Sequence, residues 1–87
     1  MAEAEREMRA EVEAFPGSVE ARVRLAALYR ILGRRAEARA TLLGTVAAEA
    51  EAYATILGAL QDLDDGVAAA EWGRRAHALF PDDPRFK

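Results

Sequence analysis

The chain has 87 residues and no cysteine, so it has the length of one small domain and lacks the residues of disulfides, zinc–thiolate sites and thiol catalysis. Hydrophobic residues make up 52%, enough for a packed core, and the net charge of -3 does not favour nucleic acid, which calls for a strongly basic surface. Met1 is followed by an acidic, alanine-rich pattern rather than a signal peptide, and no apolar run reaches the roughly 18 residues of a membrane span. We therefore expect a cytoplasmic protein that neither inserts into membranes nor binds nucleic acid.

The first helix is predicted over residues 2–15, because Met8, Val12 and Phe15 recur at helical spacing. A Pro-Gly pair at 16–17 ends this helix. Proline cannot continue the hydrogen-bond ladder, and glycine suits a left-handed cap.

The second helix is predicted to begin after Ser18, a residue type that favours the N-cap position, and to end at Gly33. Glu20 is placed to favour the positive end of the helix dipole. Its apolar stripe consists of Ala21, Leu25, Leu28, Tyr29 and Leu32.

Three more helices are predicted, and the period stays near 3.6 residues, so no strand is expected. The third runs from Arg34 to about Glu49, and the fifth is capped by Asp64 or Asp65 and ends at Pro81. The inward stripes of the third, fourth and fifth helices are Ala38, Leu42, Thr45 and Val46; Tyr53, Ile56, Leu57, Leu60 and Leu63; and Ala69, Trp72, Ala76, Leu79 and Phe80.

An internal repeat links these helices. Three pairs of landmark residues are each separated by 31 residues, namely Leu25 and Ile56, Ala38 and Ala69, and Thr45 and Ala76. Alanines at such landmarks are predicted where paired helices cross, because a larger side chain would push the backbones apart.

Eight residues of the first unit fall at the spacings of a two-helix repeat, namely Leu25, Ala26, Tyr29, Gly33, Glu37, Ala38, Leu42 and Thr45. This pattern resembles the tetratricopeptide (TPR) family, whose unit is about 34 residues of helix–turn–helix. The resemblance implies a single all-α domain, a right-handed stack of about five helices. It divides the chain into a half-repeat helix at 1–15, repeats at 16–50 and 51–83, and the start of a further helix at 84–87.

The resemblance also implies that the first helix of each pair lines a concave groove that binds another protein or peptide. Residues off the core stripe would form a mostly apolar groove floor with flanking arginines. The predicted partner-binding residues are Val23, Arg24, Ala27, Arg30, Ile31, Ala54 and Gly58. Such a surface suits a helix or an extended peptide with an apolar anchor and a carboxylate. The alternative is that these residues pack against a neighbouring helix.

Catalysis has little support from the sequence. His77 is the one histidine, so the sequence offers little support for a histidine-paired nucleophile and excludes a two-histidine metal site. We predict that His77 is a surface or boundary residue. Asp62, Asp64 and Asp65 lack the ligand spacing of a calcium loop and are better explained by helix capping. We therefore expect a non-enzymatic protein with no catalytic residue, metal or cofactor.

Four arginines cluster around the first predicted turn: Arg30, Arg34, Arg35 and Arg39. One interpretation is a contact with phosphate or an acidic peptide. The interpretation that we favour is that they neutralise the aspartates of the next turn, across adjacent units or through a neighbouring copy.

The alternative function is self-association, with a homo-oligomer or larger complex assembled through open apolar ends. These ends are predicted around Met8, Val12, Trp72, Phe80 and Phe86. Because stacked repeats usually end with a helix whose outer face is polar, we expect a piece of a longer protein or an open end covered by another chain.

Overall fold

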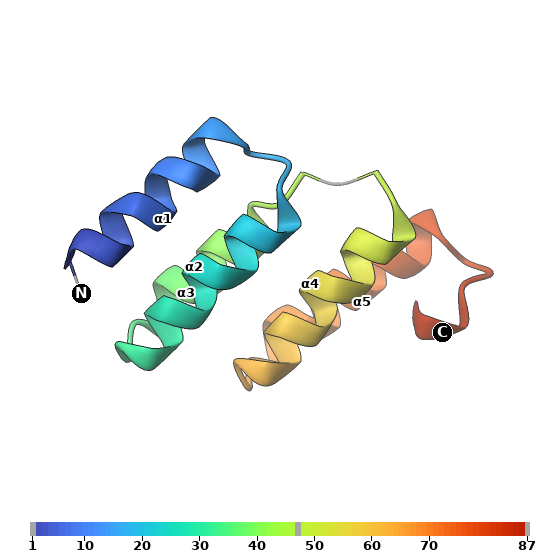
Figure 1. Ribbon diagram of the computed structural model, residues 1–87. Helices are drawn as coiled ribbons and strands as arrows, with labels where there is room; N and C mark the ends of the chain where they lie inside the picture. Colours follow the sequence, from blue (N-terminus) through green and yellow to red (C-terminus); the bar gives the residue numbers. More distant parts are fainter. Residues whose placement is uncertain (1, 47, 87) are drawn as a thin grey trace.

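The computed structural model describes residues 2–46 and 48–86, which form five α-helices and one 3-10 turn (Figure 1). The helices are α1 (Ala2–Ala14), α2 (Val19–Ile31), α3 (Arg35–Leu43), α4 (Ala50–Asp62) and α5 (Gly66–Leu79), and the turn is η1 (Pro84–Phe86). Within these residues there is no strand, so the predicted all-α class is confirmed. Met1, Ala47 and Lys87, which belong to the predicted half-repeat, third helix and last helix, lie outside the described residues.

The helices stack as successive hairpins. α2 packs against α3, α4 packs against α5, and α1 packs against α2. Figure 1 shows α2 and α4 side by side in one layer, with α3 and α5 behind them. The result is an elongated stack of 42 × 25 × 13 Å with the chain termini at opposite ends.

The helix starts and turns follow the predicted signals. The Ser18 hydroxyl accepts a hydrogen bond from the Ala21 amide at 3.2 Å, and the Asp65 carboxylate accepts one from the Ala68 amide at 3.1 Å. Both bonds satisfy amides that a helix N-terminus leaves unpaired. Gly33 turns the chain between α2 and α3 with a φ of 78°, a conformation that glycine adopts without a steric penalty.

The core is built from alanines where helices cross and from larger side chains beside the crossings. Ala38 and Ala76 are fully buried, which lets their helices approach closely. Trp72 is 1% exposed, stacks on Tyr53 with ring centroids 4.8 Å apart, and donates a hydrogen bond to the Tyr53 carbonyl at 3.0 Å. This aromatic pair joins α4 to α5.

The predicted end of the third helix is wrong. α3 stops at Leu43, not near Glu49, and Gly44 is its C-cap. Arg22 donates a hydrogen bond to the Thr41 carbonyl at 2.9 Å and so satisfies one of the carbonyls exposed at this helix end. A side chain at Gly44 would meet the same guanidinium at 3.0 Å, so glycine makes room for it.

Several large apolar residues that were counted in the apolar spacing of the predicted helices are exposed instead, and all lie at or beyond a helix end. They are Phe15, Leu32, Val46 and Leu79. At these positions the helix is ending or has ended, so the helical period no longer points the side chain at the core. Val46, beyond the end of α3, is 76% exposed.

The predicted apolar ends also need correction. Trp72 and Phe86 are buried, and Met8, Val12 and Phe80 are partly buried and pack against the core. Phe80 lies 5.6 Å from the Tyr53 ring and 6.2 Å from the Phe86 ring, so the last turn folds back onto the second hairpin. These aromatic side chains therefore stabilise the fold rather than an exposed end.

Candidate functional site

A small apolar cavity of about 70 Å³ lies between α2 and α4. Its floor is formed by buried side chains of α2 and α3, and its mouth by half-buried residues of α2 and α4. The lining residues are Val23, Ala26, Ala27, Arg30, Ala38, Leu42, Ala59, Asp62 and Leu63.

The cavity exists because alanines meet where larger side chains would fill the space. Ala27 of α2 and Ala59 of α4 stand on opposite sides of the mouth, and each side chain ends at Cβ. Ala38 and Leu42 of α3 close the floor and are fully packed, so the depth of the cavity is fixed.

A guanidinium is held at the rim of the cavity. Arg30 donates a hydrogen bond from Nη1 to the Asp62 carbonyl at 3.1 Å, which bridges the ends of α2 and α4. This bond uses one of five N–H donors and leaves the positive charge without a carboxylate partner in residues 2–46 and 48–86. The rim therefore combines an apolar opening with a positioned guanidinium and the exposed side chain of Asp62.

Of the residues predicted on the first unit, the structure brings Val23, Ala27 and Arg30 together at the cavity. Arg24 points elsewhere, because it pairs with Glu11 of α1 at 3.1 Å and with Glu20 at 3.7 Å. Ile31 does not line the cavity and is 72% exposed at the end of α2.

The residues predicted on the second unit, Ala54 and Gly58, do not line the cavity. They repeat Val23 and Ala27 at the offset of 31 residues, and both are half-buried, with Ala54 packed against the core. A Cβ built on Gly58 would meet no atom within 4 Å, which agrees with an open surface.

The wall that α4 contributes was missed: Ala59, Asp62 and Leu63. These residues are spaced i, i+3 and i+4 and therefore share one helix face. That spacing was visible in the sequence. A cavity between two units is lined by the side of α2 that faces α4 and by the side of α4 that faces α2. The prediction instead chose equivalent repeat positions on both helices.

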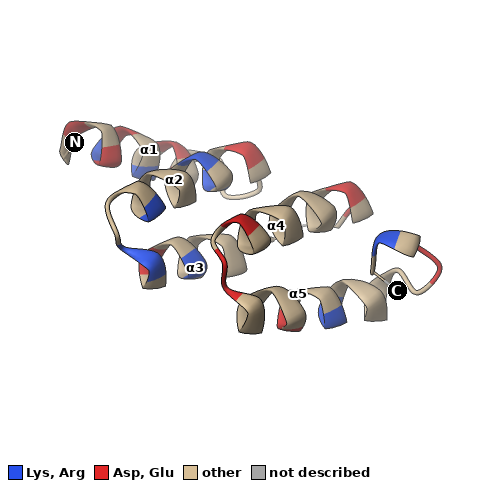
Figure 2. Ribbon diagram, turned by 90° about the horizontal axis from the view of Figure 1, so that it is seen from below, with Lys and Arg blue, Asp and Glu red and all other residues tan. Residues whose placement is uncertain are grey.

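The predicted neutralisation of the second turn by the four arginines is found for one of them, Arg39, while Arg30 and Arg35 bond to backbone carbonyls of that turn. Arg39 pairs with Asp65 at 3.4 Å, and Arg35 donates a hydrogen bond to the Leu63 carbonyl. Figure 2 shows the basic residues at the start of α3 and the acidic residues of the α4–α5 turn on the same edge of the molecule. Together with Arg30, these contacts hold the two hairpins in register across the cavity.

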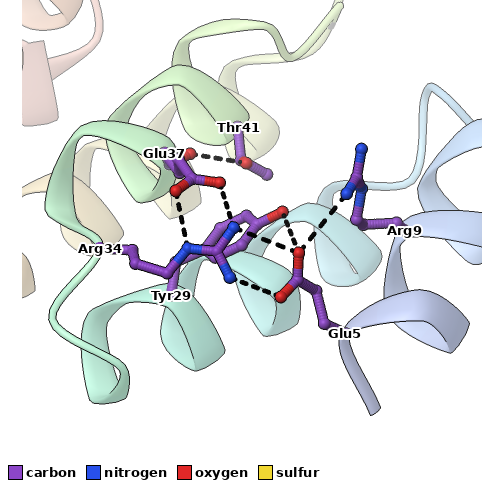
Figure 3. Close-up of polar contacts among 6 residues, drawn as sticks. All are labelled: Glu5, Arg9, Tyr29, Arg34, Glu37 and Thr41. Carbon is purple, nitrogen blue, oxygen red and sulfur yellow. Dashed lines mark hydrogen bonds and ion pairs between the residues drawn. The ribbon is translucent and has the colours of Figure 1, made fainter. Parts of the chain in front are cut away.

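Arg34 points in the opposite direction and holds α1 (Figure 3). Its guanidinium contacts Glu5 and Glu37, each at 2.5 Å, and lies over the Tyr29 ring at 4.7 Å. These hydrogen bonds lower the pKa of both carboxyl groups, while burial raises the pKa of Tyr29. Arg9 also pairs with Glu5, at 3.5 Å.

We call this cluster the α1 clamp, defined by Glu5, Arg9, Tyr29, Arg34 and Glu37. It attaches α1 together with the partly buried Met8 and Val12, since no residue of that helix is fully buried. It is a structural ion-pair network that joins three helices.

His77 is exposed on α5, in agreement with the predicted surface position. Residues 2–46 and 48–86 contain no group of three or more metal-ligating side chains, and no helix among them is long and apolar enough to cross a membrane. Comparisons with protein-family models, with curated proteins and with solved structures gave no match.

Proposed function

We propose that this chain is a non-enzymatic, TPR-like interaction module that binds a helix or peptide of another protein across the α2–α4 face. The observation that carries the proposal is the apolar cavity with Arg30 fixed at its rim. A partner side chain that enters the cavity gains burial against prepacked walls, and a polar neighbour meets the guanidinium. The stacked hairpins and the 31-residue repeat support the TPR-like organisation.

A displayed library of random 16-residue peptides provides a direct test. Peptides selected on the wild-type chain should lose binding to Ala27→Trp, because an indole at position 27 covers the mouth of the cavity. Ala78→Trp is the matched control, since Ala78 is an exposed alanine of α5 outside the cavity lining. Circular dichroism checks that both variants stay folded. The proposal fails if no peptide is enriched, or if both variants bind the selected peptides as the wild type does.

Self-association is less well supported by the side-chain positions. Of its five predicted residues, Trp72 and Phe86 are buried and the others are partly buried. The outward face of α1 is charged and presents Glu3, Arg6 and Glu7. The α2–α4 face is therefore the better candidate for an interaction surface.

A further inference from the structure

We propose that the α2–α4 face selects an amphipathic helix of a partner protein. This helix inserts a branched aliphatic side chain into the cavity and places a carboxylate, one helical turn away, against Arg30. This inference rests on the proposed function and specifies the chemistry of the partner. It follows from the size of the cavity, the state of Arg30 and the way in which α1 already docks on the first unit.

The cavity is too small for an aromatic ring. It measures about 70 Å³, whereas an aliphatic cavity of about 150 Å³ is the size that accepts benzene. Its floor cannot retreat, because Ala38 and Leu42 are fully packed against the core. Valine, isoleucine or leucine is therefore the side chain that fits.

Arg30 is the cation best prepared for a carboxylate. Arg24, Arg34 and Arg39 already pair with carboxylates of this chain. Among residues 2–46 and 48–86, Arg30 bonds to the Asp62 carbonyl alone, so its side chain is positioned and its charge has no carboxylate partner there. A partner carboxylate can then bind without having to order a flexible arginine.

The first unit already receives one helix with this pattern. α1 places Met8 and Val12 against the core, and Glu11, three residues after Met8, pairs with Arg24 at 3.1 Å. An aliphatic residue and a carboxylate one turn apart thus match the neighbouring face of the same unit. We infer that a partner helix bound across α2 and α4 carries the same combination of an aliphatic residue and a carboxylate.

The test uses a displayed library of 16-residue helical peptides that is randomised at four positions on one face. Selection on the wild-type chain should enrich valine, isoleucine or leucine with aspartate or glutamate three or four residues away. Exchange of the aliphatic anchor for phenylalanine should weaken binding by about tenfold or more, since the packed floor at Ala38 and Leu42 leaves no depth for a ring. Exchange of the peptide glutamate for glutamine should weaken binding by about fivefold.

Coupling to Arg30 is tested by a double-mutant cycle. The glutamate-to-glutamine exchange in the peptide should have less than about a twofold effect on the Arg30→Gln variant, while the Arg74→Gln variant, an exposed arginine of α5, should behave as the wild type does. Circular dichroism confirms that both variants are folded.

The outcomes separate this inference from the proposed function. Peptides that require Ala27 but carry an aromatic anchor, or whose carboxylate does not couple to Arg30, overturn the inference and leave the proposed function standing. Failure of the helical library alone overturns the inference and leaves the proposed function standing. Peptides that bind equally to wild type and Ala27→Trp, or failure of both the random and the helical library to enrich any peptide, overturn both.

Discussion

Alanines occupy two kinds of position in this chain: the packed core and the edge of the cavity. Substitution by leucine should change the free energy of unfolding in opposite directions at the two kinds of position. Ala38 and Ala76 are 0% exposed and let helix backbones approach, so they belong to the packed core. Ala59 stands at the edge of an unfilled cavity of about 70 Å³. A side chain placed in this opening would bury apolar surface against Ala38 and Leu42.

We therefore predict that Ala59→Leu raises the free energy of unfolding by about 0.5–2 kcal/mol, because the new side chain fills the cavity. Leucine has nearly the helix propensity of alanine, so α4 itself is not penalised. Ala76→Leu is the matched control and should lower stability by about 1–3 kcal/mol through overpacking. Urea unfolding followed by circular dichroism measures both values. Destabilisation by Ala59→Leu as large as that by Ala76→Leu would show that the cavity does not accept the side chain.

Two glycines allow a second comparison at the residue scale. Gly33 has a φ of 78°, so Gly33→Ala should cost about 1–2 kcal/mol. Gly58 lies inside α4, where an added Cβ would have no atom within 4 Å, and Gly58→Ala should stabilise by about 0.5–1 kcal/mol. The thermal midpoint should thus fall in Gly33→Ala and rise in Gly58→Ala. A loss of stability in Gly58→Ala would contradict the open surface assigned to that face.

At the scale of the elements, α1 is the helix that depends most on polar contacts. None of its residues 2–14 is fully buried, and its two apolar contacts are Met8 and Val12. The α1 clamp therefore contributes a substantial part of its attachment, chiefly through the bonds from Arg34 to Glu5.

The clamp predicts a loss of stability in acid. Hydrogen bonds from Arg34 hold the pKa of Glu5 and Glu37 below the usual value of 4.5. A carboxyl group with a lowered folded-state pKa stabilises the fold above its unfolded-state pKa, and this contribution disappears as the pH falls through the folded-state value. Stability should therefore decline from about pH 4.5 downwards.

Urea unfolding of the wild type and of Glu5→Gln between pH 3 and pH 7 tests this prediction. Glu5→Gln should be less stable than the wild type at pH 7 and should show a shallower decline in acid. Glu13→Gln is the control, because Glu13 lies on the exposed side of the same helix outside the clamp. Identical pH profiles for wild type and Glu5→Gln would contradict the role given to the clamp.

Helix boundaries could be predicted from the sequence where a local signal marks them, and the end of α3 is the exception. Ser18 and Asp65 are caps whose side chains define a start locally. The end of α3 depends on Arg22, which is distant in sequence and bonds to Thr41 across the hairpin. A local pattern carries no information about such a partner, so the predicted helix continued past Gly44.

At the scale of the whole molecule, the all-α hairpin stack could be predicted because the repeat spacing and the alanines at helix crossings are local signals. The candidate groove could be predicted only in part. Val23, Ala27 and Arg30 were found, but the wall from Ala59 and Leu63 depends on which faces of successive helices meet. Which helix faces meet is set by packing between the two units, and the 31-residue spacing of equivalent positions does not reveal it.

We predict that the isolated chain is a monomer. The outer face of α1 is charged, Trp72 and Phe86 are buried, and Phe80 is partly buried against the core. Sedimentation equilibrium should give the monomer mass, and the thermal midpoint should not change with protein concentration. A midpoint that rises with concentration would favour the assembly function instead.

We propose that the space between α2 and α4 is kept open for a partner side chain. The most direct measurement is calorimetric titration of one library-selected peptide into the wild type, Ala59→Leu and the surface control Ala78→Leu. We predict that Ala59→Leu is more stable than the wild type yet loses at least about tenfold in affinity, while Ala78→Leu binds normally. Undiminished binding to a folded Ala59→Leu variant would contradict the account.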